Sequence, residues 1–423
     1  MKPYAVAIVI LFLCAASFGE AQPEPTLPST DPYEELPELK ASEILRPTVL
    51  EGPHHKVREE VTTYSGANRF TIDSHFGVFE AEGNEMLVRR INEINAIAEL
   101  KEVSRGEEYK NALIKAAKGP LATAKHIVTD PINTIKSAPK GIMKFMSRAG
   151  ESLKSIGKNK DKDSDEPDGS KLQQIIGFTD TKRKVALSLG VDPYSSNTVL
   201  QKELDGISWA SFAGGATFKL GTMPISGAAA VALTTTEISG SLEQILREKA
   251  PTDLKILNRK SLLAMGASEK EANQFLENGA FSPTAQTAFV LNLKSLNGVE
   301  NRRAFINLAG RTSSSEADAI FCVQTAALMS KLHKEKKPLA RITLLGDFPL
   351  CIAKDETVIV ALQWDYAAWT PTAEKFGRNL RAQTKPNSSY LVAITGTVSP
   401  QLRQRLEAKQ FQVEDRLAPG PLK

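Results

Sequence analysis

The chain has 423 residues, of which 41% are hydrophobic, 24% charged and 6% aromatic, and its net charge is +4. These proportions are ordinary for a globular protein and exclude a wholly disordered chain and a polytopic membrane protein. Three cysteines exclude a disulfide-dense scaffold and leave too few ligands for a cysteine-rich zinc fold. The length predicts two or three domains.

The N-terminus has the three parts of a secretory signal peptide. Lys2 supplies a positive charge, the apolar run 5–18 follows, and Gly19-Glu20-Ala21 forms a small-x-small cleavage site. The apolar run is short for a membrane span, which needs about 20 residues. We therefore expect cleavage after residue 21 and export to a periplasmic, outer-envelope or extracellular location. An uncleaved membrane anchor is the alternative.

The next part of the chain predicts a spacer followed by a small β module. Residues 22–43 are rich in proline and carry six acids against one base, which predicts an extended acidic spacer. Strand-like runs with turns at Gly and Asn over 57–81 predict an antiparallel meander. From Met86 to Val103 apolar residues recur at helical spacing. We expect residues 44–156 to combine this β meander with basic amphipathic helices.

A charged stretch then separates this module from the rest of the chain. Residues 157–170 contain no apolar side chain and predict a linker. Helix-start signals follow at Ser268 with Glu271, Ser282 with Pro283, and Ser313 to Ser315. They predict an α-helical domain over 171–337, and alternating strands and helices predict a small α/β sandwich over 338–418. The predicted fold class is therefore α+β and mostly helical, with an N-terminal antiparallel module, a central helical bundle and a C-terminal sandwich.

One segment concentrates positive charge. Residues 109–160 carry eleven bases and two acids, which gives +9 in a chain of +4. That asymmetry predicts contact with an anionic partner. The bases that we expect to bind an anionic lipid or polymer are Lys125, Lys136, Lys140, Lys144, Arg148, Lys154 and Lys158. Nucleic acid is not the expected partner, because the segment lacks the aromatic residues on which bases stack.

The same segment repeats weakly every eleven residues. Residues 120–125 (PLATAK) align with 131–136 (PINTIK), and Leu121, Ile132 and Met143 fall in one column. Eleven residues make three helical turns, so each column stays on one face. The pattern resembles the eleven-residue amphipathic repeats of lipid-surface proteins over about 27 residues, and the resemblance implies contact with a lipid surface. The two prolines that open the copies predict linked short helices instead of one rod.

The end of this segment predicts a basic amphipathic helix. Its apolar side chains, which we expect to face a membrane, are Ile142, Met143, Phe145 and Met146. Such a helix can lie in a membrane interface, where each nearby base contributes about 1 kcal/mol on an anionic surface. The alternative is a helix that docks its apolar stripe on the N-terminal sheet, with its lysines in solvent.

The two cysteines of the mature chain, Cys322 and Cys351, allow two states. In an oxidising compartment they could form a disulfide if their Cα atoms lie close enough. The alternative is a pair of buried free thiols. Sequence spacing does not decide between these states.

Catalytic motifs are missing from the sequence. It contains no His-Glu-x-x-His, no Gly-x-Ser-x-Gly and no phosphate-binding Gly-rich loop with Lys. We therefore predict no catalytic residue, metal or cofactor, and expect an exported, non-enzymatic cell-envelope protein. Its partners would be an anionic membrane surface or envelope polymer and, through the helical and α/β modules, a second protein.

Two other classes of function remain open at this point. An exported enzyme could assemble a site around Cys322 or from four residues of the β module, His54, His55, Asp73 and His75. A secreted effector could insert into a membrane through 207–236, which is rich in Gly, Ala, Ser and Thr and has Lys219 as its only charge before residue 237.

Overall fold

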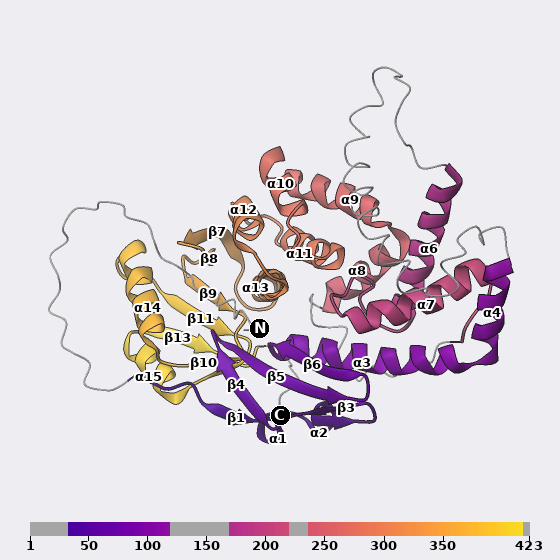
Figure 1. Cartoon of the computed structure of the whole chain (residues 1–423). Coiled ribbons are helices and arrows are strands. Elements are labelled where there is room, and N and C mark those ends of the chain that lie inside the picture. The colour runs from indigo at the N-terminus through magenta and orange to yellow at the C-terminus, as the bar shows by residue number, and fades with distance from the viewer. Residues whose placement is uncertain (1–32, 119–168, 220–235, 418–423) are drawn as a thin grey trace, which may run out of the picture.

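The computed structural model describes residues 33–118, 169–219 and 236–417. Its fold is mixed α+β, as predicted, with 55% helix and 19% strand. An antiparallel sheet, a group of helices and a mixed sheet follow one another along the chain (Figure 1). The fold class predicted from the sequence is therefore confirmed.

The N-terminal sheet has six strands in the order β1-β4-β5-β3-β2, with β6 also paired to β5. Its strands are β1 (Glu38–Lys40), β2 (Glu51–Gly52), β3 (His55–Val57), β4 (Glu60–Tyr64), β5 (Ala67–Ser74) and β6 (Gly77–Glu82). Two short helices, α1 (Ala41–Ile44) and α2 (Pro47–Leu50), lie between β1 and β2 in the chain. All pairings in this sheet are antiparallel, so the predicted meander is present. Side chains alternate between buried and exposed along β4, which leaves one face of the strand for the core.

A long helix joins this sheet to the central helices. This helix is α3 (Asn84–Arg105). It is followed in the chain by α4 (Glu107–Lys118), α6 (Gly169–Ser188) and α7 (Thr198–Gly214). The first half of α3 packs Leu87 and Ile94 against the sheet. Its second half packs Ile97 and Leu100 against α6 and α7. One hydrophobic core therefore contains residues from both sides of the predicted linker 157–170, whose residues 157–168 lie outside the described part of the chain.

The central helices are α8 (Thr236–Glu248), α9 (Pro251–Ala264), α10 (Glu269–Leu276), α11 (Pro283–Ser295), α12 (Arg302–Thr312) and α13 (Glu316–Glu335). Three of the central helices, α10, α11 and α13, begin where the sequence signals place them. Ser268 forms a capping box with Glu271, and Ser282 caps α11. The N-cap of α13 is Ser315, which forms a capping box with Asp318. At the centre of this bundle lie four aromatic rings, Phe275, Phe281, Phe289 and Phe305.

The C-terminal sheet has five strands in the order β13-β11-β9-β8-β7. They are β7 (Leu339–Leu345), β8 (Phe348–Ala353), β9 (Val358–Leu362), β11 (Tyr390–Ile394) and β13 (Phe411–Glu414), and a separate pair joins β10 (Tyr366–Ala367) to β12 (Thr397–Val398). Strands β9, β11 and β13 are parallel, because α14 (Pro371–Gln383) and α15 (Pro400–Ala408) connect them. One face of the sheet packs on α12 and α13, and α14 and α15 cover the other (Figure 1). The predicted sandwich thus takes one of its helical layers from the central bundle.

The part of the predicted spacer that the structure describes, residues 33–43, is folded instead of extended in solvent. The backbone N–H of Glu34 donates to the Trp369 carbonyl oxygen at 2.9 Å, and its carboxylate accepts from Ser399 Oγ at 2.6 Å. Residues 38–40 form β1, and Ala41 is fully buried. An acidic side chain therefore serves here as a hydrogen-bond acceptor that fastens the segment to the C-terminal sheet, which corrects the prediction for these residues.

Asp365, just after β9, fastens the two sheets together. One of its carboxylate oxygens, Oδ2, accepts hydrogen bonds from the backbone N–H groups of Asn68 at 2.8 Å and Asn84 at 3.1 Å. Its own backbone N–H donates to the Gly66 carbonyl oxygen at 2.7 Å. Gly66 has φ +85°, and a Cβ there would lie 2.4 Å from the Trp364 ring. The β4–β5 turn therefore lies directly against the carboxyl end of the parallel strands.

Candidate functional site

The predicted anion-binding residues lie outside the part of the chain that the structure describes. They are Lys125, Lys136, Lys140, Lys144, Arg148, Lys154 and Lys158, together with the apolar Ile142, Met143, Phe145 and Met146. Of the segment 109–160 only 109–118 is described, at the end of α4. This helix packs closely on α7, since a Cβ on Gly214 would lie 2.3 Å from the Ala112 carbonyl oxygen. The anion contact itself stays a prediction.

Cys322 and Cys351 are free thiols in the structure, and both are buried in the core shared by the central helices and the C-terminal sheet. Burial raises the pKa of each thiol to about 12. The Cys322 sulfur lies 3.6 Å from Ser313 Oγ. Because thiolate is the reactive form, both side chains should be inert in the folded protein.

In a chain that begins at residue 22, we expect neither Cys322 nor Cys351 to react with a thiol reagent such as DTNB at pH 8 while the protein is folded. After denaturation without reductant, two thiols per chain should react. The count is measured by absorbance before and after adding guanidinium chloride. A count of zero after denaturation would show that the cysteines form a disulfide instead.

The four candidate residues of the β module do not gather into a metal-binding group. The Nε2 atom of His55 lies 3.1 Å from the Val49 carbonyl oxygen, and Asp73 is paired with Arg58 at 2.8 Å. Burial lowers the pKa of His55. Among the residues that the structure describes, no group of three or more His, Cys, Asp or Glu side chains could hold a metal ion.

The first part of the candidate insertion segment 207–236 belongs to a packed helix. Ile207 and Ala210 are buried in α7, whose C-cap is Gly215 in the left-handed conformation. Residues 220–235 lie outside the described chain. Over the ranges that are described, no helix has the length and apolar character needed to cross a membrane.

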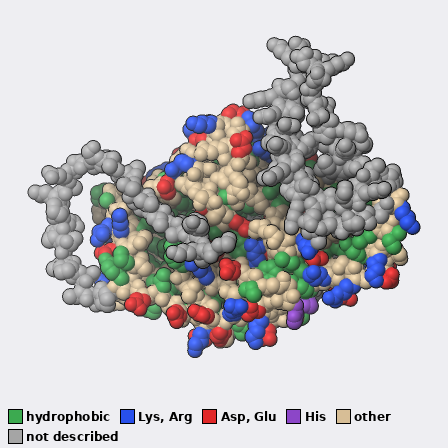
Figure 2. Space-filling view, in the orientation of Figure 1, with side chains coloured by type: hydrophobic (Ala, Val, Ile, Leu, Met, Phe, Trp, Pro, Cys, Tyr) green, Lys and Arg blue, Asp and Glu red, His purple; other side chains and the backbone are tan. Residues whose placement is uncertain are grey.

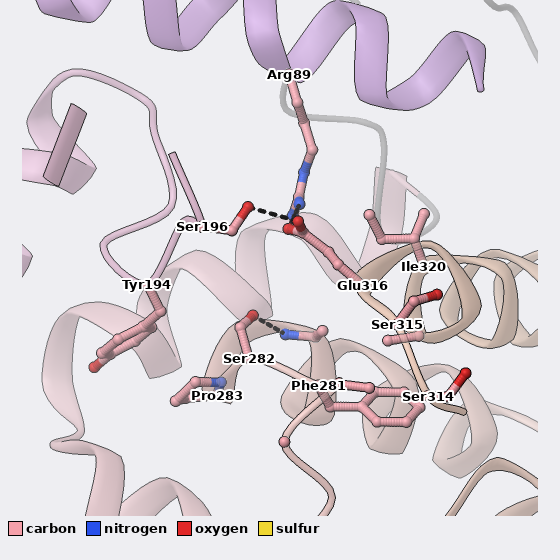
Figure 3. A pocket seen from close by; sticks show the side chains of 14 residues that line it. Arg89, Tyr194, Ser196, Phe281, Ser282, Pro283, Ser314, Ser315, Glu316 and Ile320 are labelled. Atoms are coloured by element: carbon pink, nitrogen blue, oxygen red, sulfur yellow. Dashed lines mark hydrogen bonds and ion pairs between the residues drawn. The ribbon is translucent and has the colours of Figure 1, made fainter. Parts of the chain in front are cut away.

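A pocket of about 440 Å³ lies where α3, the loop before α7 and the N-terminal ends of α11 and α13 meet (Figure 3). Its size is within the range of small-ligand sites. Its polar walls include Arg89, Ser196, Ser282, Ser315 and Glu316, and its apolar walls include Phe281 and Ile320. Figure 3 shows Arg89 reaching from α3 toward Glu316 and Ser196.

Charged groups cross-link the walls of this pocket. The Arg89 guanidinium lies 3.8 Å from the carboxylates of Asp192 and Glu316, beyond hydrogen-bond length. Arg90 lies 3.7 Å from the same Glu316 carboxylate, which also accepts a hydrogen bond from Ser196 Oγ at 2.5 Å. A helix N-terminus favours negative charge. Glu316, in the first turn of α13, supplies that charge from within the protein.

Buried acids hold the loop that forms one wall. Burial raises the pKa of Asp192, against the opposing effects of Arg89 and of a hydrogen bond from the Thr284 hydroxyl at 2.7 Å. Glu93 is 4% exposed and accepts hydrogen bonds from Arg90 at 2.6 Å and from the Asn197 amide at 2.9 Å. Because the Asn197 side chain caps α7, Glu93 ties the start of that helix to α3.

The polar side chains that line this pocket contact other groups of the protein. None of the pocket-lining residues is His, Lys or Cys. Ser282 and Ser315 accept hydrogen bonds from backbone N–H groups as helix caps, and Ser314 Oγ donates to the Asp318 carboxylate at 2.9 Å. Ser196 does contact a carboxylate, but two arginines share that carboxylate in an ion-pair network.

Sequence reasoning found the helix caps of this pocket but not the pocket. Ser282 and Ser315 were readable as N-caps because a cap depends on residues three or four positions away. Nothing local indicates that both helices begin at the same cavity, or that Arg89 faces them. No family model, curated protein or solved structure matches the chain, so its site has to be judged on these contacts.

Proposed function

We propose that this chain is an exported, non-enzymatic cell-envelope protein that contacts an anionic membrane surface or polymer through residues 109–160. The observation that carries the proposal is the charge of that segment, +9 against +4 for the whole chain. The leader-like residues 1–21 support export. The helical and α/β modules would hold a protein partner.

The fold around the segment supports a separate role for it. Helix α4 leads into the segment and α6 follows it, and both pack on α7. The core of α3, α6 and α7 is built from residues such as Leu100, Val185 and Leu204, which lie on both sides of the segment. Substitutions inside 119–168 change none of these described core residues, so the proposal can be tested in the whole protein with a folding check by circular dichroism.

The test is flotation of the mature chain, residues 22–423, with lipid vesicles. We expect it to float with vesicles that contain phosphatidylglycerol and not with phosphatidylcholine alone. High salt should abolish flotation, since the Debye length falls to about 3 Å at 1 M. Glutamine at four bases, Lys140, Lys144, Arg148 and Lys154, should weaken binding by a hundredfold or more, because each base contributes about 1 kcal/mol.

A matched control removes the same charge elsewhere. Lys202, Lys260, Lys270 and Lys294 are exposed lysines on the central helices, and their change to glutamine should leave flotation unchanged. If both four-site variants lost vesicle binding equally, only the total charge of the protein would matter, and a specific role for the segment would be refuted. If the protein floated under no condition, membrane contact would be refuted. Binding to a soluble polyanion, measured in place of the vesicles, would then test whether the segment binds an anionic polymer.

A further inference from the structure

Two equivalent turns of the C-terminal sandwich lie side by side. Strands β10 and β12 are parallel neighbours, and each leads directly into a helix, β10 into α14 and β12 into α15. Trp369 and Ser399 lie in these turns, and the backbone N–H of Ser399 donates to the Ala367 carbonyl oxygen at 2.8 Å. The N-termini of two helices therefore begin next to each other, and helix N-termini favour a negative charge.

A carboxylate of the protein already bridges these two turns. Glu34 Oε2 accepts hydrogen bonds from the Trp369 backbone N–H at 2.5 Å and from the Ser399 hydroxyl at 2.6 Å. The Ser399 oxygen in turn accepts from the Leu402 N–H at 3.0 Å, as the N-cap of α15. The backbone N–H of Glu34 donates to the Trp369 carbonyl oxygen at 2.9 Å. The two turns thus bind both the side chain and the backbone of a glutamate in a peptide.

The residue before this glutamate is bound as well. The Tyr33 hydroxyl donates to the Glu374 carboxylate on α14 at 2.6 Å. Its ring centre lies 6.3 Å from that of the Trp369 ring, within the range in which aromatic pairs attract each other. The contacts of Tyr33 and Glu34 are therefore specific for their side chains, and together they recognise the dipeptide Tyr-Glu.

The peptide that occupies the turns lies on the surface. We call residues 33–37 the strap. None of them is buried, and Tyr33 and Leu36 are 42% and 40% exposed. In Figure 1 the strap, in indigo, runs from beside α15 to β1, and Figure 2 shows acidic side chains in red along this lower edge of the molecule. Because the strap adds no buried side chain to the core, the core should stay folded when the strap detaches.

The strap also leaves one donor of the turns unsatisfied. The indole Nε1 of Trp369 is buried and has no hydrogen-bond partner among the residues that the structure describes. A buried donor without an acceptor costs about 1–3 kcal/mol. The turns can therefore bind a Tyr-Glu peptide with one more hydrogen bond than the strap provides.

We propose that these turns form a binding site for an acidic Tyr-Glu peptide of a partner protein, and that the strap is an internal occupant that this peptide displaces. The inference deepens the proposed function, and it rests on that function only in assigning a protein partner to the α/β module. Because the strap is tethered beside the site, it competes at a high effective concentration. Detaching it should therefore strengthen binding of the partner peptide.

The test measures binding of a fluorescent peptide with the sequence of residues 31–38, DPYEELPE, by anisotropy in solution without lipid. The protein is the chain that begins at residue 22, either unchanged or with Tyr33→Ala and Glu34→Ala, which remove the side-chain contacts of the strap. We expect the double variant to bind the peptide about tenfold more tightly than the unchanged protein, because the tethered competitor is weakened.

Variants of the peptide and of the site test the recognition itself. With the double variant, a Glu34→Gln peptide should bind about tenfold more weakly, because hydrogen bonds to a carboxylate are roughly twice as strong as neutral ones. The matched control is a Glu35→Gln peptide, which loses the same charge at an exposed position and should bind as the unchanged peptide does. Adding Glu374→Ala to the protein should weaken the tyrosine peptide and leave a Tyr33→Phe peptide unaffected, because phenylalanine has no hydroxyl to donate.

Three results would overturn the inference. The first is absence of peptide binding by the double variant when its circular dichroism matches that of the unchanged protein. The second is equal weakening by the Glu34→Gln and Glu35→Gln peptides, since charge alone would then explain binding. The third is a dimer of the unchanged chain in sedimentation that Glu34→Ala dissociates, which would assign the site to the strap of a second copy.

A fallback variant and a separate readout keep the test decisive. If the double variant does not fold, Glu34→Gln in the protein replaces it, and peptide binding no tighter than that of the unchanged protein would overturn the inference. Peptide binding is measured without vesicles, and flotation depends on residues 109–160. Failure of the peptide to bind therefore leaves the proposed membrane contact standing, and failure to float leaves this site standing.

Discussion

Replacing Asp365 with alanine is expected to lower the free energy of unfolding by about 3 kcal/mol and to loosen the N-terminal sheet from the C-terminal sheet. Its carboxylate accepts hydrogen bonds from the backbone N–H groups of Asn68 and Asn84. Removing the acceptor leaves both donors unsatisfied, and each such group costs about 1–3 kcal/mol. Denaturant titration measures the total loss in the free energy of unfolding. Faster hydrogen exchange at the Asn68 and Asn84 amides would show that the loss arises at this contact.

The matched variant is Asp365→Asn, which keeps an acceptor oxygen in the same position and removes the charge. We expect it to lose less than half as much stability as the alanine variant. Asp253→Ala, at an exposed position in the first turn of α9, should lower the free energy of unfolding by no more than about 1 kcal/mol. Unchanged exchange at the Asn68 and Asn84 amides in the alanine variant would contradict the role assigned to this carboxylate.

The position of Asp365 also bears on what the C-terminal sandwich can bind. In open α/β sheets, ligands bind in the crevice outside the carboxyl ends of the parallel strands. Here the β4–β5 turn contacts that end, through the Gly66 carbonyl oxygen and the close packing of Gly66 on Trp364. The usual ligand position of this architecture is therefore filled by the protein's own N-terminal sheet.

The features that sequence reasoning predicted depend on residues close together in the chain. The capping box of Ser268 with Glu271 is decided within four residues, and Ser282 needs only the N–H of Ala285. The antiparallel meander follows from alternating side chains and from turns at Gly and Asn. Local hydrogen bonding and periodicity fixed these elements, and the structure has them.

The features that were missed depend on residues far apart in the chain. Glu34 was assigned to a solvated spacer because acids among prolines usually stay in water, yet its partners Trp369 and Ser399 lie more than 300 residues later. The core that joins α3 to α6 and α7 likewise pairs residues on the two sides of a predicted linker.

The stability of the protein is expected to fall as the pH rises from about 5 to 8, because two acids share one partly buried site. Burial raises the pKa of Glu85 to about 8, and Asp365 adds to this while Arg89 opposes it. Burial also raises the pKa of Asp365 to about 7, against the hydrogen bonds from Asn68 and Asn84. Between the ordinary carboxyl pKa near 4 and these values, the folded state holds more protons than the unfolded state. Stability is therefore lost with rising pH over this window.

Glu85→Gln should flatten this dependence, because the amide has no proton to lose. Its free energy of unfolding should match that of the unchanged protein at pH 5 to within about 1 kcal/mol, the size of a helix N-terminal charge effect, and should exceed it at pH 8. Glu80→Gln, at an exposed position on β6, should keep the original slope. If the free energy of unfolding fell with pH at the same slope in Glu85→Gln and Glu80→Gln, the site shared by Glu85 and Asp365 would not set the pH dependence. A shallower slope of stability against pH in Glu85→Gln, with an unchanged slope in Glu80→Gln, would identify Glu85 as one of the groups through which pH acts on stability.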